Sequence, residues 1–349
     1  MTDLSDLRLL SLDDPLIRGA VEMSHRFGRD PEYTRGGGGN SSVKANGIVY
    51  IKPSGVSLAV IEAEDLVPLA TGPLLDLLLK GGSEDDEARV PGAPDPVMRA
   101  AAKVRMAEAK GRRPSVELMF HSLLPESFVL HTHAIVPNAV TCNLQGEELM
   151  TDLFGDEALW VPYTDPGLPL ARTINELRAA HSARTGKPAP RITFMGDHGI
   201  IVSADTTDEI ATLNQHVMGT VQGALERAGI TIGASGRAAA RIAADEARAK
   251  AVVNNIGPAL RGLLSDEGQP LKLVTYDAAP AAADYLESED GRQAVLGGAM
   301  TPDQIVYSGS FPLFFDPPAD ADPETVPALL TDALEAHVEQ HGAKPIITV

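Results

Sequence analysis

The sequence predicts a globular α/β protein with a larger amino-terminal part and a smaller carboxy-terminal part. Helix-like and strand-like segments alternate through the first part, and the composition, 44% apolar and 22% charged, is that of an ordinary globular protein. After Gly229 the sequence becomes Ala- and Arg-rich and helical, so we expect domains at residues 1–235 and 236–349. A chain of 349 residues can bury a core without a disulfide or a structural metal.

Three segments of the first 111 residues favour helices and one favours a strand. The strand is GIVYIK, residues 47–52, which Pro53-Ser54-Gly55 ends. The glycine run 36–39, with Asn40, Ser41 and Ser42 after it, predicts a turn, and the acidic, Pro-rich residues 83–96 predict a surface loop. The helical segments are 14–28, 64–80 and 96–111.

The middle of the chain places histidines on a strand and in a turn. Pro114 starts a predicted helix with Glu117 and His121 on one face, and its apolar face carries Val116, Met119, Phe120 and Leu123. The segment 127–134 favours a strand whose period of two directs His131 and His133 to the same side. His198 lies in a turn between the predicted strands 191–195 and 200–203, and Thr206 with Glu209 begins a long helix.

The last hundred residues carry no cluster of metal-ligating side chains at ligand spacing. Segments 271–276 and 305–315 favour strands, so we expect an α+β extension that serves packing or oligomer contacts.

The charge balance restricts the partners. Lys and Arg number 29 against 48 Asp and Glu, a net charge of −19, which disfavours nucleic acid and anionic membranes. The single Cys142 excludes an internal disulfide and a multi-cysteine zinc site. The acidic amino terminus lacks an export signal and no stretch is long and apolar enough for a membrane span, so we expect a cytoplasmic protein.

The histidine pair on one strand suggests a metal site. Two imidazoles held on one strand face suit Zn²⁺, and His198 and Glu117 could reach the same point. Other interpretations remain open: such pairs are often ordinary half-buried histidines, His198 could cap a hairpin, Glu117 could stabilise a helix start, and Glu117 with His121 could form a surface ion pair. The glycine run could bind an anion through backbone N–H groups, although it is not a dinucleotide-binding fingerprint.

Five sequence blocks together resemble one family. GGGGNSSVK, YIKPSG, RPSVELMFH, VLHTHA and MGDHGIIVSADTTDEI lie between residues 36 and 210 in the order and spacing of the class II aldolase/adducin family. The blocks and the carboxy-terminal GGAMTPDQIVYSGSFPL are most similar to the aldolase half of bifunctional rhamnulose-phosphate aldolase/dehydrogenases, and also resemble fuculose-phosphate aldolases. The resemblance implies a three-layer α/β/α fold around a mostly antiparallel sheet, and a homotetramer.

The resemblance also implies roles for individual residues. His131, His133 and His198 match metal ligands, Zn²⁺ first and Mn²⁺ or Co²⁺ as alternatives, and Glu117 matches the catalytic acid/base. Four residues match the lining of a phosphate or substrate pocket: Asn40, Ser54, Gly55 and Ser115. Gly37 and Val116 stand where such aldolases carry polar side chains, and no tyrosine matches their proton donor.

The implied function is that of a metal-dependent aldolase, a carbon–carbon lyase cleaving a ketose or ketose phosphate through a metal-stabilised enediolate. Decarboxylation of a 3-oxo sugar acid would pass through the same intermediate. A metal-free, adducin-like binding module and a zinc hydrolase are further alternatives. Whether the substrate is phosphorylated stays open.

Overall fold

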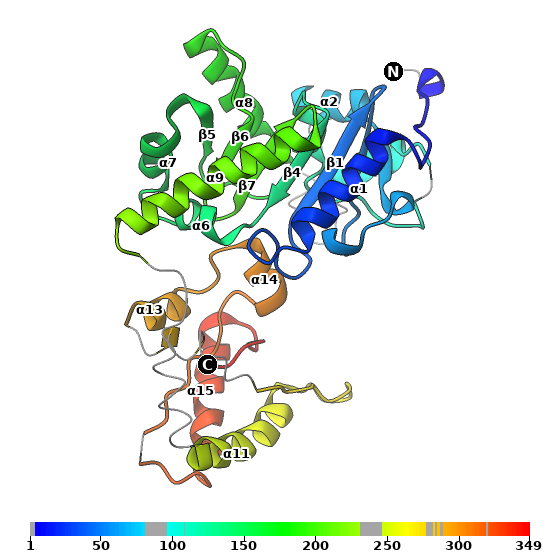
Figure 1. Cartoon of the computed structure of the whole chain (residues 1–349). Helices are drawn as coiled ribbons and strands as arrows, with labels where there is room; N and C mark the ends of the chain where they lie inside the picture. The colour runs from blue at the N-terminus through cyan, green and yellow to red at the C-terminus, as the bar shows by residue number, and fades with distance from the viewer. Residues whose placement is uncertain are drawn as a thin grey trace. The chain divides into compact units, whose positions relative to one another are not determined.

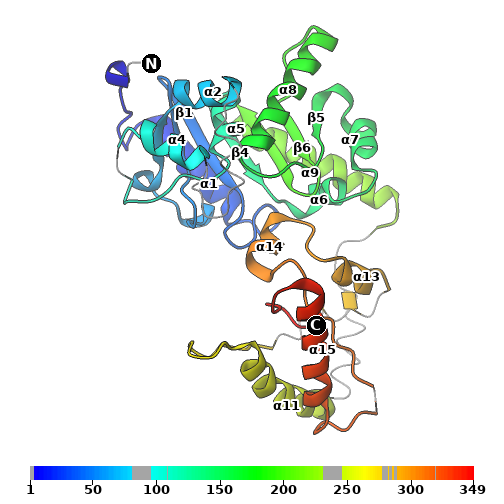
Figure 2. The same ribbon diagram turned by 180° about the vertical axis from the view of Figure 1, so that it is seen from behind.

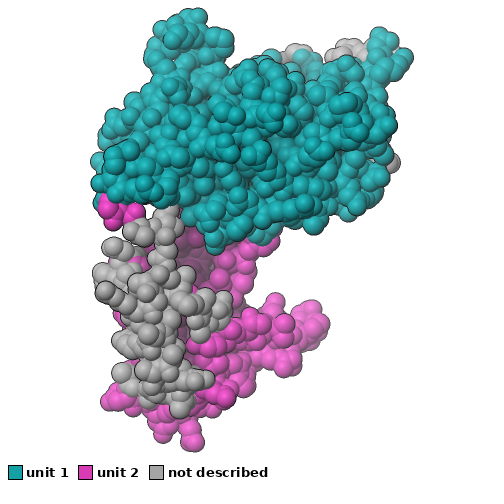
Figure 3. All heavy atoms as spheres, in the orientation of Figure 1, with its two compact units in different colours: residues 1–228 teal, residues 229–349 magenta. Residues whose placement is uncertain are grey.

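The computed structural model divides the chain into two compact units, Met1–Ala228 and Gly229–Val349 (Figure 3). It describes residues 4–80, 96–107, 109–230, 246–276, 282, 285–286, 289–318 and 320–349. The expected domain boundary at residue 235 and almost all of the predicted loop 83–96 lie outside this part of the chain.

A seven-stranded mixed sheet forms the centre of the first unit (Figure 1). The strands lie in the order β3-β2-β1-β4-β7-β6-β5, and every neighbouring pair is antiparallel except β5 with β6. The strands are β1 Asn40–Ala45, β2 Ile48–Ile51, β3 Val67–Ala70, β4 Phe128–Thr132, β5 Ala158–Val161, β6 Ile192–Met195 and β7 Gly199–Ala204. β4 is therefore the central strand, with three strands on either side.

Helices cover both faces of this sheet and give the three layers that the sequence predicted. Two buried apolar clusters separate the layers: helices α1, α6, α7 and α9 contribute to one, and α2, α4, α5 and α8 to the other. Figures 1 and 2 show these two sets from opposite sides. The helices are α1 Pro15–Gly28, α2 Thr71–Lys80, α4 Pro96–Val104, α5 Leu118–Leu123, α6 Ile135–Thr141, α7 Gly146–Phe154, α8 Leu168–Thr185 and α9 Thr207–Arg227.

Alternation along β4 decides which face carries the candidate site. Val129 packs into the α2, α4, α5 and α8 cluster, and Leu130 packs into the cluster on the opposite face. His131 therefore returns to the α5 side, because successive side chains of a strand alternate. The ring of Phe120 from α5 meets the His131 ring edge-on, 5.7 Å between centroids.

Several predicted elements differ from those observed in the first unit. Asn40, Ser41 and Ser42 belong to β1 rather than to the predicted turn, since they pair with β2 and β4. The segment 64–80 contains strand β3 before helix α2, and the helix predicted for 96–111 ends at Val104. Val116 is 48% exposed rather than part of an apolar face, because α5 begins only at Leu118.

The described residues of the second unit are mainly helical. Its longer helices are α11 Glu246–Leu264, α13 Glu289–Gly297, α14 Pro302–Ser308 and α15 Val326–His341. Residues 271–276 form no strand, and the start of the predicted strand 305–315 is the end of α14, leaving a single bridge from Leu313 to Thr348. A capping box of Thr301 and Gln304 explains this difference, because it favours a helix start. No described helix combines the length and apolar character needed to cross a membrane.

Candidate metal centre

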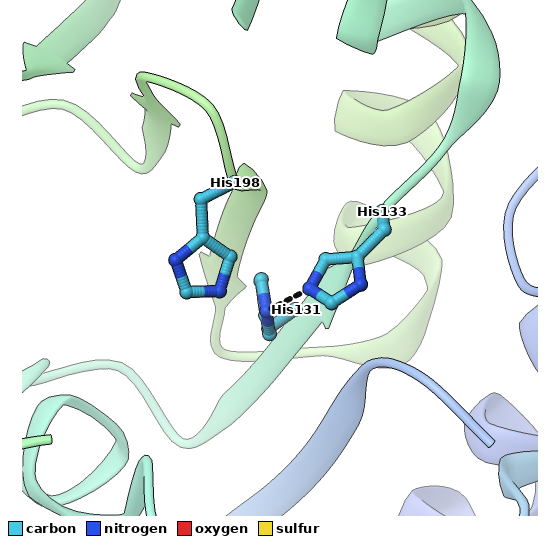
Figure 4. Close-up of side chains that lie close together, drawn as sticks. All are labelled: His131, His133 and His198. Carbon is cyan, nitrogen blue, oxygen red and sulfur yellow. Dashed lines mark hydrogen bonds between the residues drawn. The ribbon is translucent and has the colours of Figure 1, made fainter. Parts of the chain in front are cut away.

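Three histidine side chains converge at the end of the central strand (Figure 4). His131 lies on β4, His133 just beyond its end, and His198 in the turn between β6 and β7. One ring nitrogen from each lies within 4.8 Å of those of the other two. His131 and His198 are buried, and His133 is half-buried. The structure thus brings together the three residues that the sequence singled out as ligands.

Close backbone packing holds the two histidine-bearing segments together. β4 and β7 pair with His131 opposite Ile201. Gly199, directly after His198, leaves no room for a side chain, because a Cβ there would lie 2.4 Å from the carbonyl oxygen of Thr132. A glycine at this position therefore allows the turn to approach the end of β4.

Hydrogen bonding fixes the tautomer of His131. Its Nδ1 lies 2.9 Å from the carbonyl oxygen of Ile200 and must donate, which leaves a lone pair on Nε2. That Nε2 lies 2.9 Å from Nε2 of His133. Burial lowers the pKa of His131 to about 3, so the ring is neutral at physiological pH. Neutral imidazole is the form that binds metal ions.

The carboxylate of Glu117 lies directly against this histidine cluster. Glu117 is the N-cap residue of α5, is 7% exposed, and places Oε1 3.0 Å from Nε2 of His198 and Oε2 3.5 Å from Nε2 of His131. Burial raises the pKa of Glu117, but the neighbouring imidazoles, together with a hydrogen bond from His198, outweigh burial and hold this pKa well below its usual range. The Glu117 carboxylate and Nε2 of His131 are both acceptors. The donor set therefore fits a shared positive charge such as a divalent cation.

Asn40 holds the Glu117 carboxylate, and Ser115 holds Asn40 and the Glu117 backbone. Asn40 pairs with His131 across β1 and β4, and its Nδ2 donates to Oε2 of Glu117 at 2.5 Å and to Oγ of Ser115 at 3.2 Å. The Ser115 hydroxyl oxygen also accepts from the backbone N–H of Glu117 at 3.3 Å. Both residues are buried, so water competes little for these hydrogen bonds.

Ser54 and Gly55 lie in an exposed turn that is joined to the same segment. The backbone N–H of Ser54 donates to the carbonyl of Arg113 at 2.9 Å, and Pro53 forms a bridge to Pro114. The turn is therefore next to the chain leading to Ser115. All four residues predicted to line a pocket come from two adjoining segments and the start of β1.

The sequence did not predict that His121 and Ser42 lie at this centre. His121 is wholly buried, and its ring nitrogens contact Ser42 Oγ at 2.7 Å and Asn40 Oδ1. Period-two alternation of Asn40 and Ser42 along a strand would have been the signal, but the adjacent glycine run suggested a turn. The alternative of a surface ion pair between Glu117 and His121 is wrong, since both are buried.

Comparison with known proteins gives a family match over most of the first unit. Residues 19–225 match the family described as "Class II Aldolase and Adducin N-terminal domain". A curated relative, the "Uncharacterized oxidoreductase YuxG" of Bacillus subtilis (strain 168), is 25% identical over 345 residues, which are 94% of this chain and 47% of the relative. The chain therefore spans about half the length of that relative.

A solved structure shows the same fold. The N-terminal class II aldolase domain of a conserved protein from Thermoplasma acidophilum is 21% identical, with a TM-score of 0.51, covering 63% of this chain and 98% of that one. An L-fuculose-1-phosphate aldolase from Thermus thermophilus is 16% identical, with a TM-score of 0.40, covering 61% of this chain and 94% of that one.

Proposed function

Because this chain belongs to the class II aldolase and adducin family, we propose that it is a metal-dependent aldolase that cleaves a ketose or ketose phosphate. One observation carries the proposal: a buried carboxylate, Glu117, lies 3.0 Å and 3.5 Å from two of three clustered histidines. An adducin-like binding module would not need this arrangement, since burying a carboxylate is costly without a positive charge beside it.

His131, His133 and His198 would hold one divalent cation, Zn²⁺ or alternatively Mn²⁺ or Co²⁺. When bound, such a cation supplies Lewis-acid stabilisation of negative charge on carbonyl and hydroxyl oxygens. The chain's contribution is to fix the lone pairs of the ligands. His131 shows this, because its Nδ1 donates to the Ile200 carbonyl.

Glu117 would move the proton at the carbon where the bond breaks. Its carboxylate is held by Asn40 while Oε1 faces the histidines, so it can accept and return a proton without leaving the cluster. Low exposure limits competition from water at this carboxylate. Ionisation of Glu117 is consistent with the base form needed at neutral pH.

The substrate would approach from the side of the exposed Ser54-Gly55 turn. Asn40, Ser54, Gly55 and Ser115 are our candidates for contacts with a sugar or sugar phosphate. Backbone N–H groups of a glycine-containing turn can bind phosphate, whereas the overall charge of −19 gives no attraction to an anion.

A substrate screen tests this function. Protein loaded with Zn²⁺, Mn²⁺ or Co²⁺ is incubated with ketose 1-phosphates, free ketoses and 3-oxo sugar acids, and aldehyde and carbon dioxide release are measured. We expect metal-dependent aldehyde release from a ketose substrate. Release of carbon dioxide alone would reassign the protein as a decarboxylase. If the protein takes up no metal and turns over none of these substrates, a binding module would be favoured.

We further propose a symmetric homotetramer in which residues 236–349 provide packing or oligomer contacts. The chain has no tyrosine that matches the family's proton donor, so a donor from a neighbouring subunit or from the carboxy-terminal region would complete the site. Light scattering at working concentration tests this assembly, and a fully active monomer would contradict it.

A further inference from the structure

A continuous row of side-chain hydrogen bonds lies behind Glu117. It runs from Ser42 on β1 to His121 on α5, then to Asn40 on β1, and from there to Glu117. Ser42 and His121 are less than 5% exposed, so water cannot replace these contacts readily. The row joins the sheet to the helix whose N-cap is Glu117.

Donor and acceptor chemistry gives this row one direction. Asn40 Nδ2 faces the Glu117 carboxylate, which only accepts, so Asn40 Oδ1 faces His121 and must accept from it. Nε2 of His121 therefore carries the proton, and Nδ1 accepts from the Ser42 hydroxyl at 2.7 Å. Burial lowers the pKa of His121 well below its usual range, so the ring stays neutral and keeps one donor and one acceptor nitrogen.

The Glu117 carboxylate sets the orientation of the Asn40 amide, and His121 supports that orientation. If the amide were turned over, Oδ1 would face the carboxylate of Glu117 and Nδ2 would face the N–H of His121. The first contact would then join two acceptors, and the second would join two donors unless the His121 proton moved to Nδ1. His121 thus holds the Asn40 amide in place by donating to Oδ1, and the donation from Nδ2 fixes where the carboxylate points relative to the histidine cluster.

Packing alone does not explain an imidazole at this position. The His121 ring stacks on Phe120 with 4.7 Å between centroids and 24° between planes, a contact that an aromatic hydrocarbon ring would also make. The His121 carbonyl is held separately by Lys44 Nζ at 2.9 Å. The two ring nitrogens of His121 therefore serve the hydrogen-bond row, and a hydrocarbon ring could not replace them.

We propose that His121 is a positioning residue that fixes the Asn40 amide and, through it, aims the Glu117 carboxylate for proton transfer. The role rests on the proposed aldolase function, in which Glu117 is the acid/base. It assigns to Asn40 a part in holding Glu117, in addition to any contact with substrate.

A double-mutant cycle tests whether His121 acts through Asn40. The variants are His121→Phe, Asn40→Ala and the two combined, with metal content and melting temperature measured beside kcat and KM. We expect His121→Phe to keep the metal and KM but to lower kcat by roughly 10-fold to 100-fold, as expected for a displaced catalytic group. The combined variant should be no slower than Asn40→Ala alone, because the two residues act in series.

The matched control is His181→Phe, which replaces a buried histidine on α8. It should lower stability without changing kcat. Turnover of His121→Phe within twofold of the natural protein, or fully multiplicative losses in the combined variant, would overturn the proposal. If His121→Phe does not fold, His121→Leu is the second variant, with the same expectations.

A second measurement separates this proposal from the function on which it rests. Nuclear magnetic resonance of the Asn40 side-chain NH₂ in metal-loaded protein reports the amide orientation without any substrate. In His121→Phe we expect these two resonances to move and broaden, and unchanged resonances would refute the positioning role. Absence of aldol cleavage in the natural protein, with the resonances shifting as expected, would refute the function and retain the positioning role.

Discussion

Replacement of Glu117 by Gln separates proton transfer from metal binding. In the structure Oε2 of Glu117 accepts from Asn40 and Oε1 lies 3.0 Å from Nε2 of His198. The amide oxygen of Gln can keep the Asn40 contact, so the shape survives while the proton acceptor is lost. General acid–base residues contribute about 10²–10⁴ in rate, which corresponds to about 2.7–5.4 kcal/mol in the barrier.

Two further variants sharpen this test. Glu117→Asp keeps the charge but withdraws the carboxylate by one methylene from the histidine cluster, so cleavage should also fall strongly. Glu126→Gln is the matched control, because Glu126 is likewise a buried glutamate but its carboxylate lies 4.0 Å from the guanidinium of Arg178. It should change stability without changing kcat.

The assay measures initial rates of aldehyde release at saturating metal and substrate, together with metal per chain. Excess metal is needed because a changed neighbour of the ligands can weaken metal binding about 10-fold to 100-fold. Near-normal turnover of Glu117→Gln at full metal loading would refute the acid/base role. Loss of the metal in this variant, even in excess, would instead make Glu117 chiefly a ligand.

Three other perturbations follow from the same geometry. Elemental analysis should find close to one metal per chain in the natural protein, and His131→Ala should lose most of it. His216→Ala, at an exposed histidine of α9, should keep the metal. Equal metal content in the two variants would contradict the ligand assignment. Gly199→Ala should lower the melting temperature and metal content, because its Cβ would lie 2.4 Å from the Thr132 carbonyl oxygen; an unchanged melting curve would contradict this packing argument. Burial lowers the pKa of Lys44 to about 7, so metal-free protein should gain stability as pH rises from about 7 to 10.5, by at most about 5 kcal/mol. Urea unfolding at both ends of that range should show a smaller gain for Lys44→Met, and an equal gain would refute the shifted pKa.

The sequence predicted that the three histidines lie together because the signals for this are local. Alternation along residues 127–134 placed His131 and His133 together, and the turn around His198 lay between two recognisable strands. The three-layer arrangement was implied by the family resemblance of the five sequence blocks rather than by periodicity. The observed sheet and helices confirm it.

The sequence could not predict contacts that depend on pairing between distant segments. β1 was hidden because the preceding glycines and the polar residues Asn40 to Ser42 look like a turn, although the strand lies in the interior of the sheet. His121 looked like a helix-surface residue until β1 was placed beneath α5. The strand predicted at 305–315 does not form at its start, because the capping box at Thr301 begins helix α14 there.

The pairing of β1 with β4 and of β4 with β7 makes the metal centre a reporter of correct folding. Asn40 lies opposite His131, and His131 lies opposite Ile201, so a slip of one residue on β4 would turn the imidazole to the other side of the sheet. If the three histidines bind a cation as proposed, a chain with the wrong strand alignment would not bind it until the alignment is right. The time course of metal capture during refolding would follow the last alignment step of the sheet, even where circular dichroism has already reached its final value.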